Sequence, residues 1–364
     1  MEKDKELGKF TEKEIYEIPA SLRNAISQKS VLNQVASDIV SRKTRHLYLI
    51  GAGSSYHAGL AMTYLFNKFA KIPTFSEYAM EFRYLIKPIL TDKDCIIAIS
   101  QSGETKDTIQ SIKLAKEIGC LTISITNYLD STLSKMCDYH LLLNCGEEKS
   151  VLATKTYVAE LGVLAGLALE IANELKEIGS RDYNELWVEL LKISDKIHSH
   201  LPTLHKKIKE YSLFFKFAEF CFILGSGPDY ATALEAALKL KEGARIFGQA
   251  YSTAEFPHGP ITLAEPKTCI LAIIPQEKDE RRDNLLHLLE RIKERKATIL
   301  GIYEELGDNE IPKPIDFGIA VPNTHINLQP MIMIIAVQLL TLEISRIKGI
   351  NCDTPKFLSK VSGI

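Results

Sequence analysis

Two loops that combine glycine with hydroxyl side chains are the first residues in this chain that could do chemistry. Residues 49–56 read LIGAGSSY and residues 100–105 read SQSGET, and we call these stretches the hydroxyl loops. Each follows an apolar run and precedes a helical pattern, and the free N–H groups of a helix N-terminus attract anions. The hydroxyl loops could therefore wrap a phosphate together, although serine and threonine at such positions also serve as ordinary helix caps.

The composition of the hydroxyl loops favours a sugar monophosphate over a nucleotide. The first loop lacks the third glycine of the dinucleotide fingerprint, because His57 or Ala58 stands at that place, and neither loop has the lysine of a P-loop. Neutral hydroxyls suit a single phosphate group on a sugar. Glu104 would either discourage a second anion or remain a solvated carboxylate in the first turn of a helix.

A helix in the second half carries charged side chains at helical spacing. Glu235, Lys239 and Glu242 fall at i, i+4 and i+7, so they share one face. This pattern is typical of an exposed stripe of salt bridges. The alternative is a carboxylate that moves a proton and is poised by the neighbouring lysine.

Two further residues are candidates for acid–base or carbonyl chemistry. His258 lies in residues 254–260, AEFPHGP, where two prolines and a glycine fix the backbone around a side chain that titrates near neutral pH. Lys360 stands near the chain end. Each residue taken alone is more typical of an exposed surface.

Short β-branched runs alternate with helical patterns, and these elements must position the candidate residues. The rhythm predicts five parallel strands covered by helices on both faces, which is a three-layer α/β/α domain. The runs recur 174 to 177 positions later, which predicts an internal duplication of the whole α/β domain. The predicted strands are 46–50, 72–75, 95–99, 121–126 and 140–145, then 220–225, 269–275, 298–303 and 317–322.

The predicted organisation has two domains with a helical connection between them. The connector carries apolar residues at helical spacing and predicts one or two amphipathic helices broken near Pro202. After residues 269–275 the chain continues as QEKD, so we expect the second domain to have lost its second hydroxyl loop. The predicted segments are an N-terminal arm (1–25), a first domain that binds phosphate (26–185), the connector (186–212), a second domain with the catalytic helix and histidine loop (213–350), and a tail with Lys360 (351–364).

Length and composition indicate a globular protein that acts on a small ligand. The chain has 364 residues and a formal net charge of −2, which gives no reason to expect nucleic acid or an anionic membrane as a partner. Seven cysteines without CxxC pairs argue against a disulfide framework and a zinc site, and indicate a reducing compartment. A charged N-terminus and no apolar run approaching roughly 18 residues predict a cytoplasmic protein.

The order of the motifs resembles the isomerase half of glucosamine-6-phosphate synthase, the glutamine:fructose-6-phosphate amidotransferase, or a stand-alone relative such as a glucosamine-6-phosphate deaminase of the sugar isomerase (SIS) family. The resemblance runs nearly end to end and implies two tandem SIS domains, each a five-stranded parallel sheet flanked by helices. The matching stretches are KEIYEIP (13–19), GAGSSYHA (51–58), ISQSGETKDT (99–108), STLSKMCD (131–138), ATKTYVAEL (153–161), ALEAALKLKE (233–242), EFPHGP (255–260) and DTPKFLSK (353–360).

The resemblance implies a role for each matching residue. Glu242, helped by Lys239, would carry a proton between C1 and C2 of the sugar. His258 would assist ring opening from the neighbouring subunit of a homodimer, and Lys360 would meet the C2 carbonyl as a Schiff base or polarising cation. No metal or redox cofactor is required. The implied phosphate ligands are Ser55, Ser100, Gln101, Ser102 and Thr105, and the implied sugar contacts are Ala52, Gly53, Ser54 and Val151.

The implied activity interconverts fructose 6-phosphate plus ammonia with glucosamine 6-phosphate, in either direction. The glutaminase half of the synthase is missing from this sequence, so the ammonia would be free or would come from a separate glutaminase. Ala52 and Ala153 stand where the synthase usually has cysteine and serine, which leaves the substrate detail open. A fructosamine-6-phosphate deglycase and a non-catalytic phosphosugar sensor are the alternatives, and a sensor would be expected to lack Glu242, His258 or Lys360.

Overall fold

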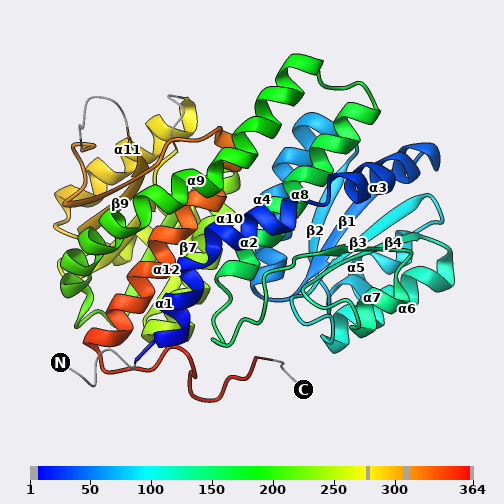
Figure 1. Ribbon diagram of the computed structural model, residues 1–364. Helices are drawn as coiled ribbons and strands as arrows, with labels where there is room; N and C mark the ends of the chain where they lie inside the picture. Colours follow the sequence, from blue (N-terminus) through cyan, green and yellow to red (C-terminus); the bar gives the residue numbers. More distant parts are fainter. Residues whose placement is uncertain (1–6, 276–278, 306–310, 361–364) are drawn as a thin grey trace. The chain divides into compact units, whose positions relative to one another are not determined.

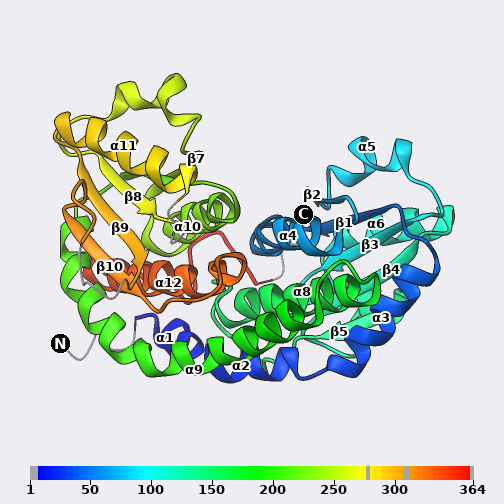
Figure 2. The same ribbon diagram turned by 90° about the horizontal axis from the view of Figure 1, so that it is seen from above.

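The computed structural model describes residues 7–275, 279–305 and 311–360. The chain forms two compact units, and each is described here by itself (Figures 1 and 2). Within the described residues, the first unit contains 17–148, 153–194 and 359–360, and the second contains 7–16, 149–152 and 195–358. Both units therefore gather segments that lie far apart in the sequence.

A five-stranded parallel sheet in the order β2-β1-β3-β4-β5 forms the centre of the first unit. Alternate side chains of a strand point to opposite faces. Leu49 therefore faces helix α4, whereas Tyr48 and Ile50 pack with Ile112 of helix α6 on the other face. The strands are β1 (His46–Gly51), β2 (Thr74–Tyr78), β3 (Asp94–Ile99), β4 (Leu121–Thr126) and β5 (Tyr139–Leu142).

The second unit repeats this topology. Its parallel sheet has the order β7-β6-β8-β9-β10, which is the order of the first sheet with β6 in the place of β1 and each later strand in turn. The predicted α/β class and tandem five-stranded sheets are confirmed. The strands are β6 (Phe220–Gly225), β7 (Phe247–Ser252), β8 (Cys269–Ile273), β9 (Thr298–Glu304) and β10 (Phe317–Val321).

Helices cover both faces of each sheet. In the first unit, α8 packs against α2, α3 and α4. In the second unit, Figure 2 shows α11 on one side of β8, β9 and β10 and α12 on the other. The helices are α1 (Lys9–Tyr16), α2 (Ile18–Ile26), α3 (Lys29–Ser41), α4 (Ser54–Leu65), α5 (Phe82–Leu85), α6 (Lys106–Ile118), α7 (Thr132–Met136), α8 (Lys155–Glu174), α9 (Ser180–Tyr211), α10 (Pro228–Ala244), α11 (Glu280–Glu294) and α12 (Pro330–Ile347).

Two elements differ from the sequence prediction. Strand β7 had no predicted counterpart, because FGQAYS at this sheet edge is only partly buried and carries no continuous apolar run. Helix α9 runs through Pro202 without the predicted break. Proline removes one N–H from the helical ladder, but buried apolar residues continue at helical spacing past it. These residues include Leu190, Ile193, Ile197, Leu201, Leu204 and Ile208.

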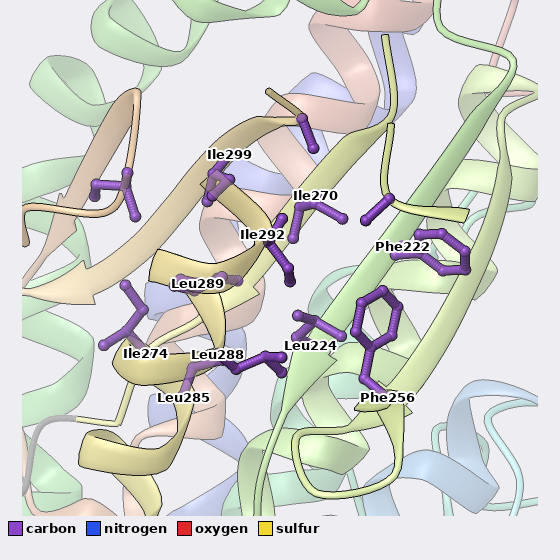
Figure 3. Packing of buried hydrophobic residues seen from close by; sticks show 14 of the residues in the cluster. Phe222, Leu224, Phe256, Ile270, Ile274, Leu285, Leu288, Leu289, Ile292 and Ile299 are labelled. Carbon is purple, nitrogen blue, oxygen red and sulfur yellow. The ribbon is translucent and has the colours of Figure 1, made fainter. Parts of the chain in front are cut away.

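The core of the second unit lies between α11 and one face of its sheet (Figure 3). Leu285, Leu289 and Ile292 lie on one face of α11, because their spacing matches the helical repeat. They pack toward alternate residues of the strands, including Leu224 and Ile270. Full burial of each such side chain contributes roughly 1.5–3 kcal/mol to the stability of the fold. These side chains therefore stabilise the sheet against which α10 packs.

The N-terminal helix and the tail meet in the second unit. Asp353 accepts hydrogen bonds from the N–H of Phe10 (3.0 Å) and from the N–H and hydroxyl of Thr11 (2.8 and 2.7 Å). This carboxylate therefore caps the N-terminus of α1. The carbonyl of Asp353 also accepts the N–H of Val151 at 3.0 Å, which fixes the backbone of that residue. Residues 7–16 of the predicted arm are thus built into the second unit.

Two helices are long and apolar enough to span a membrane by length and composition alone, whereas the sequence analysis expected no run near that length. They are α8 and α12, and 94% and 89% of their most apolar windows are buried inside the structure. Central helices of a protein core have the same length and hydropathy. Both helices lie against neighbouring helices of their own unit.

Candidate active site

The two hydroxyl loops leave neighbouring strands at the point where the chain direction across the sheet reverses. From β1 the chain passes to β2 on one side and then returns to β3 on the other. Ile50 of β1 lies opposite Ala98 of β3, so both strands end at the same level. Ligands of open parallel sheets bind at such a switch point.

The residues at the N-cap positions of α4 and α6 do not cap these helices with a side chain. Gly53 precedes α4 and Thr105 precedes α6, and neither makes a side-chain capping bond. The hydroxyl of Thr105 instead lies 2.9 Å from the hydroxyl of Ser100. The interpretation of Thr105 as an ordinary helix cap is therefore wrong, and no capping side chain occupies the N-terminal end of α6, where an anion is favoured.

Gly103 shapes the second hydroxyl loop. Its φ is +68°, and its N–H donates to the hydroxyl of Ser100 at 3.1 Å. A Cβ at this position would lie 2.3 Å from Oγ of Ser131, so only glycine fits. In the same loop the hydroxyl of Ser102 accepts the N–H of Glu104 at 3.1 Å, and the carbonyl of Gln101 accepts the N–H of Asn127 at 3.0 Å.

Glu104 is engaged with the start of α7. Its two carboxylate oxygens accept the N–H and the hydroxyl of Thr132, both at 2.7 Å. This is a helix-capping arrangement. The carboxylate that follows the hydroxyls of the second loop therefore has a structural partner of its own.

The first hydroxyl loop places a serine beside a buried carboxylate. Ala52 and Gly53 are exposed, and the carbonyl of Ala52 accepts the N–H of Ser55 at 3.2 Å. Ser55 is buried, and its hydroxyl donates to Oε1 of Glu160 at 2.9 Å. The sequence analysis missed Glu160. Its signal was a charge inside a mostly apolar helix, α8, which predicts a buried carboxylate with a specific partner.

Lys360 is held by a second buried carboxylate of the first unit. Its Nζ lies 2.7 Å from Oε2 of Glu148, whose side chain is fully buried. Glu148 also accepts from the N–H groups of Thr154 and Thr156 and from the Thr156 hydroxyl. Burial by itself would raise the pKa of Glu148. Lys360 and these hydrogen bonds lower the pKa by more than burial raises it, so the net pKa of Glu148 lies below the usual range. Sequence reasoning missed Glu148 because its main partner, Lys360, is 212 positions away in the sequence.

The charged face of α10 is buried, so its interpretation as an exposed stripe is wrong. Nζ of Lys239 lies 2.7 Å from Glu242 and 3.4 Å from Glu235. The side chains of Lys239, Glu235 and Glu242 are 1%, 0% and 17% exposed. Burial lowers the pKa of Lys239, but the two carboxylates raise it more, so the net pKa lies above the usual range. The result is a fixed ammonium beside one carboxylate, that of Glu242, which retains access to solvent.

The remaining predicted site residues are divided between the two units, with His258 and Val151 in the second and Ser54 in the first. His258 ends a short 3-10 helix (Phe256–His258), is exposed, and donates its N–H to the carbonyl of Glu255 at 3.1 Å. Its side chain makes no hydrogen bond to the described residues. Val151 is partly buried and is held through its backbone by Asp353. Ser54 opens α4 in the first unit and is partly buried.

The second unit carries an altered copy of the first hydroxyl loop. Gly227 has φ 60° and ψ −135°, close to 53° and −125° for Gly53, and each precedes a helix. Asp229 thereby takes the place of Ser55. Burial raises the pKa of the Asp229 carboxyl to about 7, while Arg281 lowers it and Asp279 raises it to smaller extents. The copy of the second hydroxyl loop includes residues 276–278, which lie outside the described residues.

No group of three or more His, Cys, Asp or Glu side chains within residues 7–275, 279–305 and 311–360 is arranged to hold a metal ion. The chemistry that the described side chains can supply is of three kinds. They offer hydroxyl and backbone donors at the switch point, an ammonium held by a carboxylate at Lys360, and a carboxylate beside a fixed ammonium at Glu242.

Comparison with protein families gives one match that covers most of the chain. A model of the SIS domain matches residues 41–179 and 218–347. Among curated proteins, the glutamine–fructose-6-phosphate aminotransferase (isomerizing) of Clostridium tetani is 34% identical over 360 residues, which are 96% of this chain and 58% of that protein. The protein of the same name from Thermococcus kodakarensis is 34% identical over 353 residues, 96% of this chain and 57% of its own length. This chain thus spans a little over half of these relatives.

Solved structures show the same fold. The C-terminal domain of glucosamine-fructose-6-phosphate aminotransferase from Francisella tularensis superposes with a TM-score of 0.87 at 29% identity, over 93% of this chain and 96% of that one. The glucosamine-6-phosphate deaminase of Thermotoga maritima superposes with a TM-score of 0.75 at 23% identity, over 97% and 99% of the two chains. The second likeness concerns the fold alone.

Proposed function

This chain belongs to the SIS domain family, and on that premise we propose that it interconverts fructose 6-phosphate plus ammonia with glucosamine 6-phosphate, in either direction. Glutamine–fructose-6-phosphate aminotransferases are among its relatives, and its similarity to them covers 96% of its own length. The proposed substrate is a hexose 6-phosphate. The ammonia is either free or delivered by a separate glutaminase.

The buried cluster of Glu235, Lys239 and Glu242 carries this proposal. A lysine that is 1% exposed between two carboxylates is costly to build. A protein that only senses a phosphosugar has no need of it. An enzyme that moves a proton between adjacent carbons needs one carboxylate held in place, and the contact with Lys239 at 2.7 Å holds Glu242.

The chemistry in the synthetic direction uses three groups of this chain. Lys360 engages C2 of the open-chain ketose as an imine or as a polarising cation. Ammonia then displaces the lysine amine from the imine or adds to the polarised carbonyl, and in both cases the C2 carbonyl oxygen leaves as one water. Glu242 removes a proton from C1 and returns it to C2, which converts the ketose frame to the aldose. His258 assists ring opening by moving a proton between the ring oxygen and the anomeric hydroxyl. The deamination is the same sequence in reverse.

The hydroxyl loops are the proposed phosphate site. Ser55, Ser100, Gln101, Ser102 and Thr105 would hold the phosphate, and Ala52, Gly53, Ser54 and Val151 would surround the sugar. Thr105 at the N-cap of α6 makes no side-chain capping bond, and this supports the assignment because a helix N-terminus attracts an anion. We further propose a cytoplasmic homodimer in which His258 serves the neighbouring subunit.

Product analysis by mass spectrometry tests the proposal. The protein is incubated with fructose 6-phosphate and ammonium near neutral pH, and in parallel with glucosamine 6-phosphate alone. We expect aminosugar phosphate in the first reaction or ammonia in the second. Glu242→Gln should abolish turnover while fructose 6-phosphate still binds, and Glu219→Gln, an exposed change in the same unit, should leave turnover unchanged.

Two other results would each point elsewhere. Unchanged turnover in Glu242→Gln would exclude the proposed proton carrier. Binding of fructose 6-phosphate with no product in either reaction would favour a sensor, or a deglycase if fructosamine 6-phosphate is cleaved in a third reaction.

A further inference from the structure

The hydrogen bond between Ser55 and Glu160 creates a conflict at the proposed phosphate site. The hydroxyl of Ser55 donates to Oε1 of Glu160 at 2.9 Å, and both side chains are buried. A serine hydroxyl has a single proton to donate. A phosphate at the N-terminal end of α4 would need that proton, because a phosphate dianion accepts hydrogen bonds and has none to offer.

Charge makes the conflict sharper. An ionised Glu160 would lie one hydroxyl away from a phosphate dianion, and two like charges at such a distance repel strongly in a buried setting. A proton on Glu160 removes the repulsion. It also turns the carboxyl group into a donor, so that Glu160 donates to Ser55 and Ser55 donates to the phosphate.

We propose that Glu160 takes up one proton when a phosphate group binds to the hydroxyl loops, and that this residue couples substrate binding to pH. The inference rests on the proposed function. Glu160 is a positioning residue in this account, since it acts on the phosphate through Ser55. The proton comes from solvent and stays on Glu160 until the phosphate leaves.

Other charged and titratable groups lie on α8 or elsewhere in the first unit. Burial raises the pKa of the Cys145 thiol, and the charges of Glu148 and Glu160 add to that rise. Lys155, on the same helix, lies 2.7 Å from Glu17 and also donates to the carbonyl of Glu147. Lys360 lies 2.7 Å from Glu148. On the neighbouring helices, Lys29 of α3 lies 3.8 Å from Glu170, and His57 of α4 is buried in the turn after Ser55. The test below therefore includes a variant specific to Glu160.

The matched pair of variants uses two carboxylates of the same helix. Glu160→Gln keeps the shape of the side chain and removes its charge. Glu170→Gln is the control, because Glu170 is equally buried on α8 and accepts a hydroxyl hydrogen bond from Tyr183 at 2.7 Å. Each variant is first checked for cooperative thermal unfolding.

Calorimetric titration with fructose 6-phosphate at about pH 8 counts the protons. At that pH a phosphate monoester is fully ionised, since its second pKa is about 6. Titrations in two buffers with different ionisation enthalpies give the number taken up. We expect close to one proton for the wild type and for Glu170→Gln, and none for Glu160→Gln. By linkage, the wild-type Kd should rise about tenfold per pH unit in this range and stay flat in Glu160→Gln.

Several outcomes overturn the inference. They are a wild type that binds without net proton uptake, or a Glu160→Gln variant that takes up the same number of protons. If fructose 6-phosphate gives no heat, the proposed function fails, and the titrations are repeated with inorganic phosphate. Proton uptake with inorganic phosphate then upholds the role of Glu160 on its own, and no binding of either ligand overturns both proposals.

Discussion

Lys360 and Glu148 lie 212 positions apart in the sequence, and their side chains meet at 2.7 Å in the first unit. The carboxylate is completely buried and lies against the start of α8 through Thr154 and Thr156. A residue near the end of the described chain is thereby given a defined position. A lysine that reacts with one carbon of a substrate needs its amine held at a defined position, and the contact with Glu148 provides such a position.

Replacement of Glu148 by glutamine should release Lys360. We expect turnover to fall by about 100-fold, which is typical of a misplaced catalytic group, while the hydroxyl loops keep their affinity for phosphate. The tail should also become a faster target for trypsin at Lys356 and Lys360. Glu147→Gln changes an exposed neighbour and is the control. Equal turnover and equal proteolysis in the two variants would refute the role of Glu148.

Replacement of Lys239 by methionine should destabilise the second unit. The change leaves Glu235 fully buried without its cation, and the loss of one partner of a buried pair costs about 3–5 kcal/mol. Urea unfolding measures this loss, with Lys241→Met at an exposed position of α10 as the control. The double variant Lys239→Met with Glu235→Gln should regain part of the stability. A difference of under about 1 kcal/mol between the two single variants would contradict this account.

Asp229 should make stability decline as the pH rises. Burial raises its folded-state pKa to about 7 from a normal value of 3.8, so the folded protein binds more protons than the unfolded chain between those values. Stability is therefore lost as the pH rises through this window and is constant above it. At about pH 8, Asp229→Asn should be more stable than the wild type by about 2–4 kcal/mol, and at about pH 4 the two should agree.

Thermal unfolding across this pH range distinguishes the effect of Asp229 from that of other acids. Asp283→Asn, at an exposed position of α11, should follow the wild-type profile. The opposite outcome is a stability that rises from pH 4 to pH 8 by the same amount in the wild type and in Asp229→Asn. It would mean that the Asp229 carboxyl finds a partner when it ionises.

Gly103→Ala should disrupt the second hydroxyl loop. Its Cβ would lie 2.3 Å from Oγ and 2.4 Å from Cβ of Ser131, in addition to the strain of φ +68°. Gly146→Ala is a matched control, with φ +65° and no atom within 4 Å of the new Cβ. Backbone strain alone costs about 1–2 kcal/mol, so the control should lose that much stability and keep phosphate affinity. Gly103→Ala should lose more stability and also weaken phosphate binding; equal losses would remove the steric argument.

Local sequence pattern was enough to predict most of the architecture. Apolar β-branched runs between helical patterns located nine of the ten strands found in the described part of the chain. The repeat of these runs predicted the duplicated sheet topology that the structure confirms. The exception, β7, lies at a sheet edge, where buried Gly248 and Ala250 alternate with residues that are partly or fully exposed. The pattern also grouped Ser100, Gly103 and Thr105 as one loop, because these residues are close in the chain.

The chain pattern could not determine burial or long-range pairing. The spacing of Glu235, Lys239 and Glu242 is the same on an exposed helix face and on a buried one, and only the packing of α10 against β6, β7 and α12 made it buried. The partners Ser55–Glu160 and Glu148–Lys360 are separated by 105 and 212 positions. Periodicity predicts only which face of its own helix or strand a side chain lies on. The free-energy cost of a buried charge depends on the groups that other elements place beside it. Those groups are decided by the tertiary structure.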